Sequence, residues 1–191
     1  MNTIEQEIIA ANLSEWTPVP TYAARFRDLI MTATLGQVEA ASVWYHEAQE
    51  VAEDIAEIMG VSLEVGASIV SAFSPRERWS SNVAKAFAFA NGLPVSGLQN
   101  NLRMAENAKT NGFDALKGQK TNAFARAIAG DANAIVIDVW MCRAANLGTD
   151  SPNKGQYREL SEAVTIVANE FGLTPRTAQA LIWIIVRGSA G

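Results

Sequence analysis

Apolar residues recur at helical spacing along most of the chain, and short polar stretches containing Gly or Pro separate the apolar segments. The pattern predicts helices over residues 22–34, 38–59, 62–73, 74–91, 98–110, 120–129, 138–147, 156–171 and 174–187. Residues 134–137 are extended and apolar but too short and isolated to require a sheet. We therefore expect an all-α protein, a compact helical array whose apolar faces pack against one another.

Residue types at the expected helix ends support these boundaries. Ser62, Asp138 and Thr174 stand at N-cap positions. The run Ser74-Pro75-Arg76-Glu77 has a capping Ser, Pro at the first helical position and Glu at the third, so it predicts a helix start at Ser74. Thr17-Pro18-Val19-Pro20 should break any helix, and residues 1–20 are expected to form an arm.

Length and composition indicate one domain. The chain has 191 residues, of which 49% are hydrophobic, enough for a sizeable core. We divide it into the arm 1–20, an acidic helical lobe 21–60, a core 62–148 with a hairpin at 112–124, and C-terminal helices 149–191. The apolar runs are too short to span a membrane, and the N-terminus lacks the features of a signal peptide.

The few cysteines and histidines exclude some chemistry. Cys142 is the only cysteine, which excludes an intrachain disulfide and a four-cysteine iron–sulfur cluster and indicates a reducing, cytoplasmic compartment. His46 is the only histidine and has no Cys or His partner at ligand spacing. No metal and no cofactor are expected.

Charge is unevenly distributed along the chain, although the net charge is only −5. Residues 1–75 carry 2 basic and 11 acidic side chains, whereas residues 76–126 carry 8 basic and 3 acidic ones. A locally basic face can hold phosphates even in an acidic protein, so the central segment is the candidate DNA-binding region. The simpler interpretation is scattered solvated charge. The acidic N-terminal helices are a candidate surface for a protein partner.

Candidate chemistry lies in two neighbouring stretches, residues 116–121 (Leu-Lys-Gly-Gln-Lys-Thr) and residues 135–143. Gly118 in a tight turn would let the backbone approach a phosphate, and the following helix would direct its free N–H groups at that phosphate. Lys120 at this helix start lies in a field that favours the neutral, nucleophilic amine. Asp138, which caps the next helix, can stabilise a cationic sugar centre or transfer a proton.

These stretches resemble the helix-hairpin-helix DNA glycosylases of the endonuclease III type, whose motifs read G-V-G-x-K-T-A and, eighteen residues after the lysine, V-D-T-H-V-x-R. Gly118 and Lys120-Thr121 match the first motif; Ile137-Asp138, eighteen residues after Lys120, and Arg143 match the second. Upstream, residues 69–74 (Ile-Val-Ser-Ala-Phe-Ser) are similar to the family's L-L-S-A-Q-T segment, and residues 82–86 (Asn-Val-Ala-Lys-Ala) are similar to the helix that follows it.

The resemblance implies an enzyme that extrudes a damaged or modified base and excises it, with lyase activity through a Schiff base. Lys120 would attack the anomeric carbon, and Asp138 would assist departure of the base or activate the lysine. The residues then expected to contact DNA are Lys117, Gly118, Gln119, Thr121, Arg76, Arg78 and Arg143, with Phe73 as the wedge and Trp79 as a stacking platform.

Departures from the family pattern leave other functions open. Leu116 replaces the first hairpin glycine, and Val139-Trp140 replaces the Thr-His pair. The alternative is a catalytically inactive or divergent glycosylase fold that acts in DNA binding, DNA hypermodification or binding of a host protein. A third hypothesis is a helical interaction protein with no nucleic-acid role. The small size of the domain and the absence of the cysteines for an iron–sulfur cluster suggest a phage gene. Trp140 and Trp183 are expected in the core, and Gln179 is within reach of the pocket.

Overall fold

The structure is a computed structural model and describes residues 18–188. In that range the chain is helical with no strand, which confirms the all-α prediction. The helices are α2 (Val19–Met31), α3 (Leu35–Met59), α4 (Leu63–Phe73), α5 (Trp79–Ala90), α6 (Gln99–Asn111), the 3₁₀ helix η1 (Gly112–Ala115), α7 (Gln119–Ile128), α8 (Val139–Ala144), α9 (Lys154–Glu170) and α10 (Pro175–Arg187).

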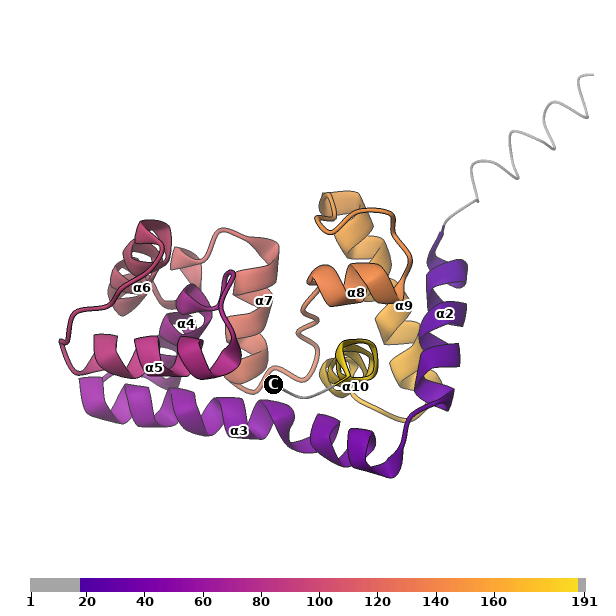
Figure 1. Cartoon of the computed structure of the whole chain (residues 1–191), viewed down its shortest axis with the longest axis horizontal. Helices are drawn as coiled ribbons and strands as arrows, with labels where there is room; N and C mark the ends of the chain where they lie inside the picture. The colour runs from indigo at the N-terminus through magenta and orange to yellow at the C-terminus, as the bar shows by residue number, and fades with distance from the viewer. Residues whose placement is uncertain (1–17, 189–191) are drawn as a thin grey trace, which may run out of the picture.

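The helices form two lobes joined along α3 (Figure 1). One lobe contains α4, α5, α6, η1 and α7, and the other contains α2, α8, α9 and α10. The long helix α3 runs beneath both lobes and packs against α4, α5, α7 and α10. The segment expected to be an acidic lobe, residues 21–60, is thus divided: α2 packs with α9 and α10, whereas α3 bridges the lobes. The N-terminal and C-terminal parts of the chain therefore build one lobe together.

Helix α4 is the centre of the first lobe. Every residue from Gly66 to Phe73 is buried, so this helix has no solvent-facing side over its last two turns. Gly66 permits the close crossing of α3 and α4, because a Cβ at this position would lie 2.2 Å from the backbone oxygen of Ala52. On another side of α4, the Ser71 hydroxyl donates to the Thr121 carbonyl at 2.7 Å and links α4 to the start of α7.

Several helix starts lie where the sequence predicts them. The side chains of Ser62, Asp138 and Thr174 each accept a backbone N–H from the first turn of the following helix. At the N-terminal end α2 already begins at Val19, earlier than expected, because Pro18 is its N-cap and Pro20 lies in the first turn, where no N–H is needed. The rest of the predicted arm, residues 1–17, lies outside the described residues.

The predicted helix start at Ser74 is wrong. Ser74 instead closes α4, since its hydroxyl donates to the Ser71 carbonyl at 2.8 Å, and α5 begins only at Trp79. Glu77 does not complete a capping box, because its carboxylate accepts hydrogen bonds from Ser81 and Lys85. Residues 74–78 therefore form a turn between two helices.

The apolar segment 134–137 crosses between the lobes as buried, extended chain and forms no strand, as predicted. The Tyr157 hydroxyl holds this segment: it accepts from the Ile137 N–H at 3.2 Å and donates to the Ile135 carbonyl at 2.8 Å. Burial raises the pKa of Tyr157 to about 12. These bonds fix the backbone immediately before Asp138.

None of the helices among residues 18–188 is by itself long and apolar enough to cross a membrane. Helices α3 and α4 meet the length and composition criteria only as a pair, and they are bent by 113° at their junction.

Candidate functional site

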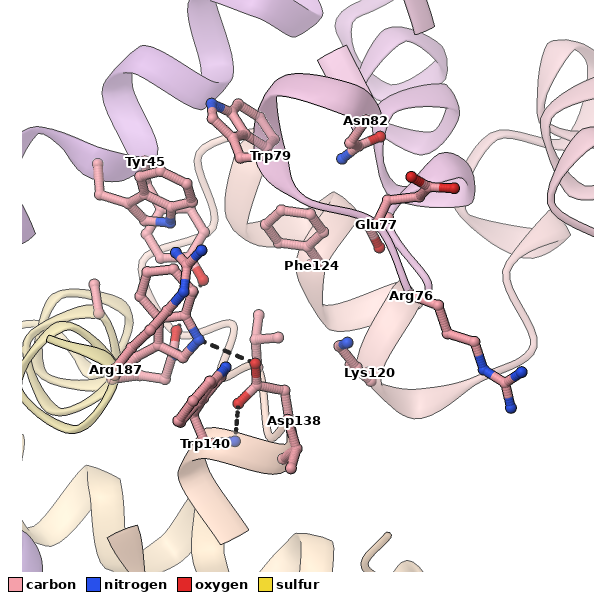
Figure 2. Close-up of a pocket in the computed structure, with 17 residues that line it drawn as sticks. Tyr45, Arg76, Glu77, Trp79, Asn82, Lys120, Phe124, Asp138, Trp140 and Arg187 are labelled. Atoms are coloured by element: carbon pink, nitrogen blue, oxygen red, sulfur yellow. Dashed lines mark hydrogen bonds between the residues drawn. The ribbon is translucent and has the colours of Figure 1, made fainter. Parts of the chain in front are cut away.

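A pocket of about 260 Å³ lies where the two lobes meet α3. Its walls come from α3, the 74–78 turn, α5, α7, the segment around Asp138 and α10. Lys120 and Asp138, the two residues predicted to act together, both line this pocket. Figure 2 shows them on neighbouring walls of one opening, with the Lys120 amine directed toward the space in front of Asp138.

Asp138 is held by three N–H donors. One carboxylate oxygen, Oδ1, accepts the backbone N–H groups of Trp140 at 2.9 Å and Met141 at 3.1 Å, which caps α8. The other oxygen, Oδ2, accepts the indole Nε1–H of Trp183 at 3.0 Å. The aspartate therefore joins the start of α8 to α10, and its orientation is fixed relative to the pocket (Figure 2).

Lys120 lies in the first turn of α7 and is exposed. Within residues 18–188 its amine forms no ion pair, so no described acid competes for it. The helix below it is anchored: the Asn122 amide donates to the carbonyls of Phe113 (2.9 Å) and Leu116 (3.3 Å), on the other side of the hairpin. A hydrogen-bonded backbone thus presents an exposed, unpaired amine at the mouth of the pocket.

Aromatic side chains from both lobes form a continuous wall of the pocket. The Trp183 and Trp44 rings stack with centroids 5.5 Å apart, and Trp44 meets Trp79 at 5.2 Å. Trp79 in turn contacts Phe124 edge-on at 6.5 Å, and Phe124 contacts Tyr45 at 6.4 Å. Two of these rings also carry a cation: the Arg187 guanidinium lies 4.6 Å from the centroid of the Trp183 ring, and the Arg176 guanidinium lies 5.5 Å from the centroid of the Tyr45 ring. A cavity of roughly 150 Å³ accommodates a benzene ring, so this pocket has room for a larger heterocycle.

Cations surround the pocket. Arg76, Lys120 and Arg187 line it, and none of the three forms an ion pair with a described residue. The acid beside them, Glu77, is already neutralised by Lys85, and the hydrogen bonds from Lys85 and Ser81 lower the pKa of Glu77. The rim therefore offers unpaired positive charge to an anion.

The hairpin residues lie next to the pocket and not in it. Lys117, Gly118 and Gln119 are exposed and line a second, shallower hollow that also contains Arg126. Gly118 is the N-cap of α7, and no side chain caps the free N–H groups of this helix. The hollow thus combines a helix N-terminus with two cations, which favour a phosphate, and with two acids, Asp114 and Asp131, which oppose it.

Two of the predicted DNA contacts are wrong in this structure. Phe73 is only 2% exposed and packs edge-on against Phe89, so it cannot reach a duplex as a wedge. Thr121 is also buried, and its hydroxyl donates to the Gly118 carbonyl, which stabilises the helix start. Both side chains are committed to packing or to local hydrogen bonds.

The remaining predicted contacts are at least accessible. Trp79 and Arg76 line the pocket, and Arg76 extends outward from it (Figure 2). Arg78 is exposed but does not line the pocket. Arg143 is exposed, pairs with Asp150 at 2.9 Å and lies over the Trp140 ring.

Sequence reasoning missed several residues of the pocket. Trp44, Asn82, Phe124 and Arg187 line it, and none of them was predicted to belong to a site. Trp183, expected in the core, packs against it but is only partly buried, and it also lines the pocket, where its indole N–H donates to Asp138.

Two further side chains line the pocket. Trp140, also expected in the core, is partly buried there. Gln179 reaches it as anticipated, and its amide oxygen accepts the buried Tyr45 hydroxyl at 2.8 Å. Burial raises the pKa of Tyr45, so this hydroxyl stays protonated.

The fold and the site define an all-helical protein of two lobes with an aromatic, cation-rimmed pocket between them. The chain belongs to a family of unknown function, DUF7178, whose model matches residues 10–190. No curated protein and no solved structure matches it. In residues 18–188 no group of three or more His, Cys, Asp or Glu side chains is placed to hold a metal ion.

Proposed function

We propose that this protein is a DNA glycosylase-like enzyme that takes an extruded base into the aromatic pocket and processes it with Lys120 and Asp138. One observation carries the proposal: an unpaired amine and an oriented carboxylate, from two successive helix starts, line the same pocket. The resemblance of these two helix starts to helix-hairpin-helix glycosylases, noted from the sequence, agrees with this arrangement. The aromatic wall supplies the stacking surface that an unstacked base needs.

The proposed chemistry uses the two side chains in complementary roles. The Lys120 amine attacks C1′, the C1′–N bond breaks with its electron pair passing to the base, and the Asp138 carboxylate accepts the proton that the attacking nitrogen loses. The leaving base takes a proton from water. Opening of the sugar ring, with a proton added to O4′, converts the C1′–Nζ adduct into a protonated imine.

Strand cleavage and turnover follow from the imine. Removal of a proton from C2′ allows the 3′ C–O bond to break, and the 3′ phosphate leaves with the electron pair. Water then hydrolyses the imine and returns the free amine of Lys120. The net change is hydrolysis of the glycosidic bond and one β-elimination, with no external oxidant or reductant.

The DNA backbone is proposed to run across the rim and the hairpin. Arg76 and Arg187 are unpaired at the pocket, and Lys117 and Arg126 lie beside the uncapped start of α7. Each phosphate neutralised by such a cation releases counterions, so binding should weaken steeply with salt. The net negative charge of the whole chain opposes long-range attraction, so these local contacts must supply most of the affinity.

Borohydride trapping on duplex DNA with a single abasic site tests the proposal. The C1′ aldehyde and the Lys120 amine form an imine with loss of water, and borohydride reduces it to a stable covalent adduct. We expect the adduct with the wild-type protein and with Lys154→Gln, a matched change of an exposed lysine on α9, and its loss in Lys120→Gln. Mass spectrometry of the digested adduct locates the modified lysine.

The same samples separate catalysis from binding. Salt-sensitive retention of DNA without any adduct on abasic or base-modified DNA would refute the lyase chemistry and favour a fold that binds DNA without turnover. Absence of DNA retention even at low salt would refute a nucleic-acid role altogether.

A further inference from the structure

A buried amide in the pocket has no hydrogen-bond partner. Asn82, in the first turns of α5, is 2% exposed and lines the pocket beside Trp79. Its backbone N–H donates to the Arg78 carbonyl, but its side-chain amide makes no hydrogen bond to any other residue, and the buried Oδ1 is unsatisfied. Figure 2 shows the amide above the Phe124 ring, with its nitrogen on the side of the pocket.

This lack of partners is unusual among the buried polar side chains. Ser71 donates to a carbonyl of α7, Thr121 donates to the hairpin, and Gln179 accepts the Tyr45 hydroxyl. The Ser68 hydroxyl is also unsatisfied, but it lies in the core on α4 and does not line the pocket. Asn82 therefore combines two features, an unsatisfied amide and a position at the wall of an aromatic cavity.

An unpaired buried amide destabilises the fold relative to an apolar side chain of similar shape. Leucine has the same number of side-chain heavy atoms, branched at the same position, without that cost. A bound ligand that forms hydrogen bonds with the amide would explain why asparagine occupies this position. The cavity in front of Asn82 is the place where such a ligand can lie.

The geometry points to Asn82 as the residue that reads the hydrogen-bonding edge of the ring bound in the pocket. The amide N–H₂ of Asn82 lies on the side of the pocket in Figure 2, and rotation by 180° about χ2 would bring the unsatisfied Oδ1 acceptor there in its place. The complement of this amide is a planar heterocycle with a donor and an acceptor on adjacent edge atoms, as every nucleobase has. Because Trp79 and Asn82 are three residues apart on α5, they share one face of the helix.

The inference deepens the proposed function by naming its specificity-determining residue. The aromatic wall binds any flat ring, whereas the amide rejects a ring of the same shape without a hydrogen-bonding edge. Loss of one or two such hydrogen bonds from a buried site lowers affinity by roughly 10- to 100-fold. Asp138 and Lys120 are not needed for this discrimination.

Tryptophan fluorescence provides the binding assay, because four tryptophans line the pocket. The probes are the four deoxynucleosides together with apolar isosteres of thymidine and deoxyadenosine, which keep the ring shapes but carry no hydrogen-bonding edge. We expect the wild-type protein to bind thymidine or deoxyadenosine at least 10-fold more tightly than the corresponding isostere. Asn82→Leu should reduce that ratio to less than about 3-fold and should not lower the thermal midpoint. Asn100→Leu, an exposed asparagine on α6, is the matched control and should retain the ratio.

A second variant keeps the test independent of folding of the leucine variant. Asn82→Asp preserves the shape and removes the donor, so it should change which nucleoside binds best. Equal affinity of the wild-type protein for nucleosides and isosteres, no binding of any nucleoside, or an unchanged preference in both Asn82 variants would overturn the inference. This binding assay does not depend on turnover. If the protein discriminates nucleosides from isosteres but forms no borohydride adduct, only the lyase chemistry is refuted. If it forms the adduct but does not discriminate, only the role of Asn82 is refuted.

Discussion

Replacement of Asp138 by Asn should destabilise the protein because one amide cannot satisfy two groups of donors. The Oδ1 atom accepts two backbone N–H groups of α8, and Oδ2 accepts the Trp183 indole N–H. Asparagine is as good an N-cap as aspartate, so the cap should survive and the new NH₂ should face the indole N–H. An unmade hydrogen bond at a partly buried donor costs about 1–3 kcal/mol. For a domain of this size that lowers the thermal midpoint by roughly 3–10 °C.

A double-mutant cycle with Trp183→Phe isolates this conflict. The phenylalanine variant loses the hydrogen bond and part of the packing against Trp44, but it carries no donor to oppose an asparagine. The double variant should therefore be more stable than the sum of the two single changes predicts. We expect a coupling free energy of about 1–3 kcal/mol, the range typical of residues in direct contact.

Urea denaturation monitored by far-ultraviolet circular dichroism is the appropriate assay, since Trp183→Phe alters the fluorescence signal. Additivity within about 0.5 kcal/mol would refute the hydrogen-bond reasoning. The borohydride trap on the same proteins separates the roles of Asp138: the double variant should be folded and yet form little adduct. A wild-type yield of adduct from Asp138→Asn would remove this residue from the proposed chemistry.

Three other predictions concern packing, backbone strain and ionisation. Gly66→Ala places a Cβ 2.2 Å from the Ala52 oxygen and should lower the free energy of unfolding, measured in urea, by about 3 kcal/mol. The control Gly36→Ala has open space around its Cβ and should be neutral or slightly stabilising. Equal effects of the two changes would contradict the close crossing of α3 and α4. Arg76 has a φ of 65°, so Arg76→Gly should gain up to about 1 kcal/mol of stability while DNA retention falls, and an unchanged retention would exclude Arg76 from the interface. Burial raises the pKa of Cys142 to about 11, so the thiol binds its proton more tightly in the folded protein than in the unfolded chain. The free energy of unfolding should therefore fall as the pH rises from about 9 to 11. Cys142→Ala should make this decline shallower in denaturation curves recorded across that pH range.

Local hydrogen bonding explains why several helix starts could be predicted from the sequence. The caps at Ser62, Asp138 and Thr174 bond to N–H groups two or three residues along the chain, so their effect does not depend on the rest of the fold. The same reasoning failed at Ser74, where the local signal was equally strong. There the serine hydroxyl bonds backward to Ser71 and the Glu77 carboxylate is taken by Lys85, so neighbouring groups outcompete the capping box.

The candidate site also contains some residues that the sequence predicts and others that it does not. Lys120 and Asp138 could be selected from the sequence because each stands at a helix start with a recognisable pattern, but only the packing of the lobes decides that they line one pocket. Phe73 could not be placed correctly, because α4 carries no charged side chain from Gly66 to Phe73 and its pattern does not show that every side of this stretch is covered.

The sequence could not assign Trp44 and Asn82 to the pocket, since an aromatic or amide side chain at helical spacing has the same pattern in a core as at a cavity. Hydrogen bonds within a turn depend on the nearest few residues and are therefore determined by the sequence alone. A cavity is the space that remains where helices distant in the sequence fail to fill the volume between them, so only the tertiary structure decides which side chains face it.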